Sequence, residues 1–237
     1  MSIIELRDIT KTYGAFTALN GVNLTVDEGT VTCVLGDNGA GKSTIIKAGL
    51  ELMDHTGTVR FFGKPLGEVR RKVAYMPQVA AVDWDYPITV EQVVTMGMYT
   101  ELGWLRRANA AHRSRVMEVL DRVGIADLAK RQISELSGGQ RRRVFVARIL
   151  VQAPELYLLD EPFAGVDAAS ERVIRGVLHE LRDQGATIVI VHHDLSTVAE
   201  LCDHVTILNR EIIATGPTSE AFTRENITKA FGLGLLE

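Results

Sequence analysis

A run of glycines that ends in a lysine and two hydroxyl residues has the clearest chemical meaning in this 237-residue sequence. The run consists of Gly36, Asp37, Asn38, Gly39, Ala40, Gly41, Lys42, Ser43 and Thr44. Glycines at this spacing let backbone N–H groups close around phosphate oxygens, because side chains there would block the approach. Lys42 is placed to reach the β- and γ-phosphates, and the Ser43 hydroxyl to hold magnesium. The spacing predicts a nucleoside triphosphate site.

Two elements must position this loop. Residues 30–35 are β-branched and apolar, which is typical of a buried strand, and residues 44–53 are compatible with a helix. The start of such a helix adds unpaired N–H groups and the positive end of its dipole to the phosphate site. An ordinary glycine-rich turn before a helix is the alternative. The flanking elements and the Gly-Lys-Ser sequence favour the phosphate site.

Two adjacent carboxylates form the second candidate feature. Asp160 and Glu161 follow the apolar stretch 156–159, and the end of a strand in a parallel sheet is where ligand-binding groups gather. Asp160 is predicted to hold magnesium through its water molecules. Glu161 is predicted to face the γ-phosphate and to take a proton from the attacking water. A helix-starting turn at Asp-Glu-Pro is the alternative.

A second glycine-rich helix start supplies the third feature, made of Ser137, Gly138, Gly139 and Gln140. Paired glycines expose backbone N–H groups, so this helix N-terminus could also bind an anion. Two phosphate-recognising helix ends in one chain suggest a site that a second copy completes. The alternative, a serine N-cap with a glycine-rich entry turn, remains open.

The remaining periodicity predicts an α/β fold. Strands before the phosphate loop alternate and those after it are short apolar runs, so an antiparallel piece should adjoin a parallel one. The expected strands are 3–9 (an edge strand), 22–26, 58–62, 73–76, 156–159, 187–191, 205–208 and 211–214. A helix is expected over 170–182 with Ser170 as its N-cap, and the tail from 218 should be helical.

One stretch interrupts this α/β pattern. Residues 87–135 contain helical spacing and no strand candidate, so we expect a helical subdomain inserted into a core lobe made of 1–86 and 136–237. The chain as a whole is expected to be one domain, 1–237. The stretch is rich in arginine, which fits a solvated helical face or, as a weaker alternative, a surface for an acidic partner or lipid headgroups.

Composition narrows the class of protein. The chain is 46% hydrophobic and 24% charged, which is usual for a globular protein, and its net charge of −4 gives no case for nucleic-acid binding. The longest apolar run, 186–191, is too short to cross a bilayer. Cys33 and Cys202 lack metal or redox spacing and are expected to be buried thiols. We expect a cytosolic protein whose membrane role, if any, passes through a partner.

Taken in order, these motifs resemble those of ATP-binding-cassette (ABC) ATPases over nearly the whole chain. Residues 136–140 resemble the family signature, 36–44 the Walker A loop, and 156–160 the Walker B strand with Glu161 as catalytic glutamate. The other resemblances are Tyr13 to the aromatic that stacks on adenine, Gln78 to the Q-loop glutamine, Asp167 to the end of the D-loop, and His193 to the switch histidine.

The sequence departs from the family pattern in three places. Asp37 stands where many members have proline, and the D-loop reads Ala-Gly-Val-Asp in place of the commoner Ser-Ala-Leu-Asp. A second histidine, His192, precedes the switch, which we assign to His193 because Asp194 and Leu195 follow it as in the family. A metal site in this His-His-Asp cluster is a less favoured alternative.

The resemblance implies a mechanism and its cofactors, ATP and Mg²⁺. Two chains pair head to tail, and each ATP lies between the phosphate loop of one chain and Ser137–Gln140 of the other. The implied catalytic residues are Glu161, His193, Lys42 and Gln78. The implied magnesium ligands are Ser43, Gln78 and Asp160.

The segment 82–97 narrows the resemblance to one branch. Its Trp-Asp-aromatic-Pro sequence, with Trp84 and Tyr86, closely resembles ATPases of manganese, zinc and iron importers. That branch implies integral-membrane permease subunits bound at Trp84 and Tyr86, an extracytoplasmic metal-binding protein reached indirectly, and a peripheral location at the cytoplasmic face of the membrane. Packing within the subdomain is the alternative for both aromatics. A transporter for a non-metal solute and a free-standing cytosolic assembly ATPase remain alternative functions.

Overall fold

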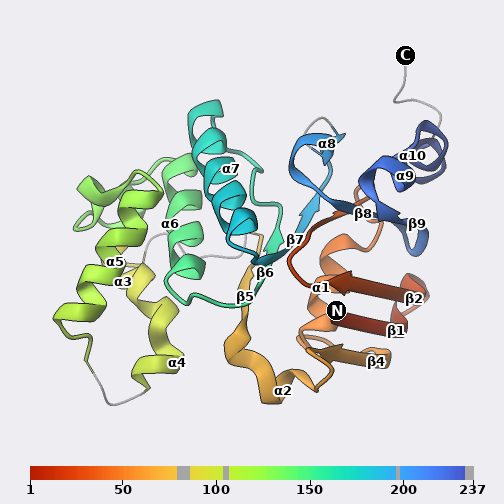
Figure 1. Ribbon diagram of the computed structural model, residues 1–237, viewed down its shortest axis with the longest axis horizontal. Helices are drawn as coiled ribbons and strands as arrows, with labels where there is room; N and C mark the ends of the chain where they lie inside the picture. The colour runs from red at the N-terminus through yellow and green to blue at the C-terminus, as the bar shows by residue number, and fades with distance from the viewer. Residues whose placement is uncertain (79–85, 104–106, 196–197, 233–237) are drawn as a thin grey trace.

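Two β-sheets organise the chain in a computed structural model that describes residues 1–78, 86–103, 107–195 and 198–232 (Figure 1). The smaller sheet is antiparallel, with β1 (Ser2–Tyr13) between β2 (Phe16–Asp27) and β4 (Thr56–Phe61). The expectation that residues 3–9 form an edge strand is therefore wrong. Both edges of β1 are paired, for example Leu6 with Leu24 on one side and with Val59 on the other.

The larger sheet has six strands in the order β5–β6–β7–β3–β8–β9. Their bounds are β5 (Val73–Met76), β6 (Leu156–Asp160), β7 (Thr187–His192), β3 (Val31–Leu35), β8 (His204–Asn209) and β9 (Glu211–Pro217). All neighbours are parallel except β9, which runs antiparallel to β8. The predicted α/β fold with an antiparallel piece beside a parallel core is confirmed.

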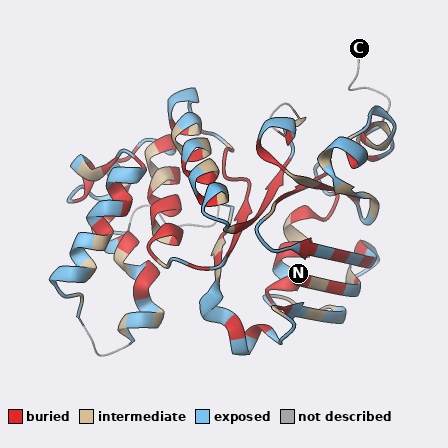
Figure 2. Ribbon diagram, in the orientation of Figure 1, coloured by how far each residue is buried: buried red, intermediate tan, exposed pale blue. Residues whose placement is uncertain are grey.

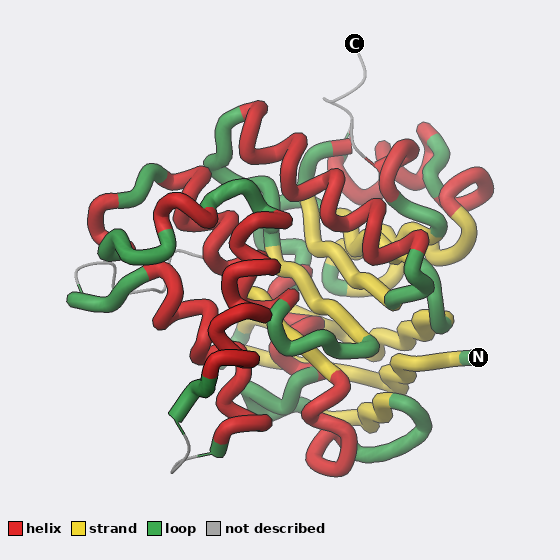
Figure 3. Tube along the Cα trace, turned by 60° about the vertical axis from the view of Figure 1, so that its left-hand side comes forward, coloured by secondary structure: helices red, strands yellow, loops and turns green. Residues whose placement is uncertain are grey.

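The central parallel strands β3, β6 and β7 are buried on both faces, which explains their continuous apolar sequences (Figure 2). Along β3, Val31, Cys33 and Leu35 pack into a core with α6 (Gly138–Leu150) and α7 (Ala168–Asp183). Val34 points to the opposite face, where it packs with the antiparallel sheet and α1 (Lys42–Gly49). The turned view shows the strands with helices packed along them (Figure 3).

The helices of residues 90–135 gather on the α6 side of the molecule, away from the antiparallel sheet (Figure 1). They are α3 (Val90–Thr95), η3 (Met96–Met98), α4 (Tyr99–Leu102), α5 (Ala110–Arg122), η4 (Ala126–Leu128) and η5 (Ile133–Glu135). Among the described residues of this stretch there is no named strand. The division of the chain into a core lobe and a subdomain stays a prediction.

The other helices are short. They are α2 (Leu66–Val69), η1 (Arg70–Lys72), α8 (Val198–Leu201), α9 (Thr218–Ala221) and α10 (Arg224–Phe231), the last two forming the expected helical tail. In the part of the chain that the structure describes, each helix is too short or too polar to cross a membrane.

The start of α7 corrects a second expectation. The helix begins at Ala168 and its N-cap is Asp167, so the prediction that Ser170 caps it is wrong. The Asp167 carboxylate accepts hydrogen bonds from the backbone N–H groups of Ala169 (3.1 Å) and Ser170 (2.9 Å). A carboxylate at this position also meets the positive end of the helix dipole, so Asp167 outcompetes the serine three residues later.

Candidate functional site

The candidate site lies where three neighbouring parallel strands end. The register pairs Leu35 of β3 with His192 of β7, and Val191 of β7 with Asp160 of β6. The phosphate loop, the two carboxylates and the two histidines therefore leave the same edge of the sheet. This is the edge at which open α/β sheets bind ligands.

The phosphate loop is held against β8 by a close backbone contact. A Cβ atom on Gly36 would lie 2.3 Å from the carbonyl oxygen of Leu208, so only glycine fits there. The Lys42 ammonium donates to the carbonyl oxygens of Gly36 (2.8 Å) and Asp37 (2.9 Å). An ammonium has three donors, which leaves one for a phosphate oxygen. Burial lowers the pKa of Lys42, although Glu161 and other nearby carboxylates oppose that shift.

Asp160 and Ser43 have the donor set that magnesium requires. The Ser43 hydroxyl donates to Asp160 Oδ1 at 3.1 Å. Asp160 is fully buried, and its Oδ2 has no hydrogen-bond partner among the described residues. Burial raises the pKa of this carboxyl group above its ordinary value, with a further rise from the charge of Glu161. A buried carboxylate oxygen without a partner beside a hydroxyl fits Mg²⁺, which binds proteins through one or two carboxylates and the phosphates of its substrate.

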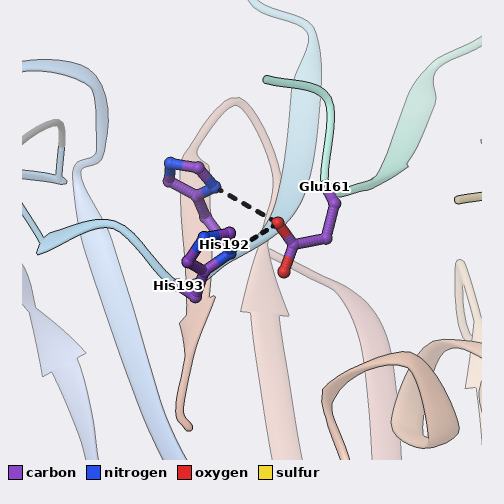
Figure 4. Close-up of side chains that lie close together, drawn as sticks. All are labelled: Glu161, His192 and His193. Carbon is purple, nitrogen blue, oxygen red and sulfur yellow. Dashed lines mark hydrogen bonds and ion pairs between the residues drawn. The ribbon is translucent and has the colours of Figure 1, made fainter. Parts of the chain in front are cut away.

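Glu161 is buried and contacts two imidazoles (Figure 4). Its Oε2 lies 2.7 Å from His193 Nδ1 and 3.7 Å from His192 Nδ1. Burial alone would raise the pKa of Glu161, but the two histidines outweigh it and hold that pKa below its ordinary value. The backbone of Glu161 has φ 55°, in the left-handed region that side chains other than glycine rarely adopt. Strained residues of this kind cluster at functional sites.

One cavity of about 300 Å³ unites most of the predicted nucleotide site. Its lining consists of Tyr13, Phe16, Ala18, Asn38, Gly39, Gly41, Lys42, Ser43, Thr44, Gln78 and Glu161. Tyr13 and Gln78 are therefore brought to the phosphate loop from distant parts of the sequence. Phe16, half-exposed across the turn from Tyr13, is a lining residue that sequence reasoning missed. In the sequence, the only signal for Phe16 was an aromatic residue two positions after Gly14.

The signature residues lie outside that cavity, at the start of α6. The Ser137 side chain accepts from the Gln140 N–H (3.3 Å), and the Gln140 side chain accepts from the Ser137 N–H (2.9 Å). This reciprocal capping box is the N-cap that sequence analysis left open as an alternative. Contact between this helix start and an ATP molecule held by a second chain stays a prediction.

Gly139 is required for packing between α6 and the start of α7. A Cβ atom at this position would lie 2.4 Å from Asp167 Oδ2 and 2.5 Å from Ser170 Oγ. Those two atoms are hydrogen-bonded to each other at 2.9 Å, so neither can move freely. The D-loop and the signature thus touch within one chain.

We expect Gly139→Ala to lower the free energy of unfolding by about 1–3 kcal/mol, because the added methyl group overpacks this contact. Gly138→Ala is the matched control, since its Cβ would meet only the Gly165 carbonyl oxygen at 3.4 Å. Urea denaturation of both variants measures the difference. Equal stability of the two variants would contradict the packing role of Gly139.

Arg142 is a further buried charge that sequence reasoning missed. Its guanidinium donates to the carbonyl oxygen of Ala164 at 3.0 Å and so ties α6 to the loop after Glu161. Burial lowers the pKa of Arg142, opposed by the negative charges of Glu161 and Asp160. Three successive arginines in an otherwise ordinary helix gave no local sign of which one is buried.

The predicted permease contacts are only partly described. Trp84 lies outside the described residues, and Tyr86 is largely exposed just before α3. Both permease contacts stay predictions.

The strand order and the loop between β3 and α1 define a P-loop nucleoside triphosphatase. The family model described as ABC transporter matches residues 19–164. That match spans more than half of the chain, which therefore belongs to the ABC transporter family of ATP-binding proteins.

Relatives in this family carry specific names. The zinc transport system ATP-binding protein TroB of Treponema pallidum is 47% identical over 97% of this chain and 86% of its own length. The manganese transport system ATP-binding protein MntB of Bacillus subtilis is 44% identical over 97% of this chain and 92% of its own. Among solved structures, an inward-facing putative metal-chelate type ABC transporter matches with a TM-score of 0.86 at 26% identity, covering 98% of this chain and 90% of that one.

Proposed function

We propose that this chain is the ATP-hydrolysing subunit of an importer for a divalent metal ion, manganese or zinc by the names of its relatives. The observation that carries the hydrolytic part is the single cavity in which Tyr13, Lys42, Ser43, Gln78 and Glu161 meet. The identity to named metal-transport subunits, over nearly the whole chain, supports the cargo. Iron remains within the same proposal, since the ion itself contacts other subunits.

In the proposed mechanism, two chains pair and bury ATP between them. The phosphate loop of one chain binds the phosphates, and Ser137–Gln140 of the other closes over the γ-phosphate through its helix N-terminus. Tyr13 stacks on the adenine. The D-loop, ending at Asp167, lies against the signature of its own chain, so closure of one element is transmitted to the other.

Hydrolysis is assigned to the residues at the ends of β6 and β7. Glu161, kept ionised by its histidines, accepts the proton of the attacking water. His193 leaves Glu161 to stabilise the transferring phosphoryl group, and Lys42 offsets its negative charge. Ser43, Asp160 and Gln78 are the residues that hold Mg²⁺, which when bound neutralises charge on the β- and γ-phosphates.

The membrane partner is proposed to dock on the helical region. A cavity of about 480 Å³ there is lined by Glu91, Gln92, Thr95, Met96, Tyr99, Leu102, Gly103, Ala108, Arg113, Val116 and Met117. Met96 and Tyr99 are 57% and 60% exposed, so the rim of the groove is apolar. Exposed apolar patches of this kind mark protein interaction sites. We assign the groove to a helix of the permease, and we propose that the chain lies peripherally at the cytoplasmic face of the membrane.

A Met96→Asp chain is expected to bind the permease about 30-fold more weakly, because a charge replaces an exposed apolar contact at the groove, worth roughly 2 kcal/mol. Leu52→Asp is the matched control, since Leu52 is similarly exposed and does not line the groove. Pull-down with the permease encoded nearby, combined with metal uptake by the reconstituted complex, measures both binding and cargo. Retained ATP binding shows that each variant is folded. Unchanged permease binding by Met96→Asp and by Trp84→Ala would contradict the proposed interface.

A further inference from the structure

A group of three possible metal ligands lies at the ends of β6 and β7, formed by Glu161, His192 and His193. Each side chain offers one ligand atom, and the three atoms lie within 4.8 Å of one another (Figure 4). Two imidazole nitrogens and one carboxylate oxygen are typical ligands of a catalytic-type zinc site, which leaves a fourth position for water. Glu161 and His193 have proposed direct roles toward ATP, whereas His192 acts in that mechanism only by favouring the ionised form of Glu161.

The environment of His192 points to a missing ligand. The residue is 4% exposed, and its Nδ1 has no hydrogen-bond partner among the described residues. The 3.7 Å separation from Glu161 Oε2 is too long for a hydrogen bond. An edge-to-face contact with Phe163, at 5.4 Å between centroids and 75°, holds the ring in place. A buried polar atom left without a partner costs free energy, which a bound ion would remove.

The distances suit a tetrahedral ion. With Zn–N and Zn–O bonds near 2.0–2.1 Å, tetrahedral geometry places N and O about 3.3 Å apart. The two observed separations, 2.7 Å for His193 and 3.7 Å for His192, fall on either side of that value. Shifts of about 0.6 and 0.4 Å would bring both N–O pairs to that value. The imidazole nitrogens, which lie within 4.8 Å of each other, must also approach to about 3.3 Å, which side-chain rotation of the exposed His193 allows. The His193 side chain is 52% exposed, which gives an ion access from solvent.

We propose that Glu161, His192 and His193 bind one divalent transition-metal ion of the zinc type in the nucleotide-free chain, and that the bound ion stops ATP hydrolysis. Binding through Nδ1 requires each imidazole to carry its proton on Nε2, so the ion replaces the hydrogen bond between His193 and Glu161. The bound ion is then coordinated by the Glu161 oxygen that would otherwise accept a proton from water. It also keeps His193 away from the γ-phosphate. The inhibitory half rests on the proposed function, under which rising cytosolic metal would slow its own import.

The first test measures binding alone. Zn²⁺ is titrated calorimetrically into the nucleotide-free full-length chain without magnesium, and one ion per chain is expected. We expect His192→Gln and His193→Ala each to weaken Zn²⁺ binding at least tenfold, because each removes one of three ligands. His179→Ala, a partly exposed histidine on α7 outside the cluster, is the control and should bind Zn²⁺ as wild type does. Thermal melting and ATP binding verify that the buried His192→Gln variant is folded.

The second test measures inhibition at fixed Mg-ATP. Zn²⁺ should inhibit the wild-type ATPase, and at least tenfold more Zn²⁺ should be needed for His192→Gln, each relative to its own basal rate. Wild-type Zn²⁺ affinity in both histidine variants would overturn the site. Inhibition that excess Mg²⁺ reverses equally in wild type and His192→Gln would place the ion at the phosphate loop and also overturn it. Absence of Mg-ATP hydrolysis without Zn²⁺ would instead refute the proposed function and leave the binding result standing.

Discussion

Glu161→Gln should bind ATP and Mg²⁺ but hydrolyse ATP roughly 10²–10⁴-fold more slowly than the wild-type chain, the range that a general base contributes. An amide cannot accept the proton of the attacking water. Glutamine also removes the negative charge beside both imidazoles. The nearer imidazole is that of His193, whose Nδ1 lies 2.7 Å from Glu161 Oε2. Because the γ-phosphate remains intact, the ATP-bound pair of chains should persist.

Phosphate release and size-exclusion chromatography with ATP measure the two parts of this prediction. Glu155→Gln is the control, because Glu155 is a surface carboxylate paired with Lys72 at 2.9 Å and should not affect turnover. Turnover by Glu161→Gln at the wild-type rate would refute the role assigned to Glu161. Lost turnover without a dimer would refute the paired-chain arrangement alone.

Asp160→Asn should separate stability from activity. In the folded chain, burial raises the pKa of Asp160 above its unfolded value. The unfolded chain therefore binds fewer protons than the folded one between these two pKa values, and stability falls as pH rises through that window. Asparagine carries no charge, so at neutral pH we expect the nucleotide-free variant to be about 1–2 kcal/mol more stable. Mg²⁺-dependent hydrolysis should be lost because the carboxylate that fits the ion is gone.

Urea denaturation at pH 7 and at pH 4 tests the sign, since the gain in stability should shrink at the lower pH. Asp167→Asn is the control, because the pKa of Asp167 is shifted in the direction opposite to that of Asp160. Hydrogen bonds from Ser170 lower the pKa of Asp167, so removing its charge should give no gain in stability. A less stable Asp160→Asn chain at neutral pH would contradict the unfavourable charge assigned to Asp160.

The candidate site could be predicted from the sequence because each of its parts is formed by neighbouring residues. The loop 36–44 lies between an apolar strand and a helix start, and the parallel strands show continuous apolar runs because both faces are covered. Asp160 and Glu161 follow such a run directly. A strand, a turn and a helix start each leave a pattern within a few residues, so they could be read from the sequence.

Contacts between distant segments left no such pattern. The central position of β1 depends on β4, and the burial of Arg142 depends on the loop at Ala164. The unpartnered Nδ1 of His192 depends on how β7 lies beside Glu161. By itself, the sequence determined the phosphate loop, the adjacent carboxylates Asp160 and Glu161, and the α/β class, because each depends on the pattern of neighbouring residues. Only the tertiary structure decided the strand order, the glycine contact at Gly139 and the histidine cluster, because pairing and packing across the chain place those atoms together.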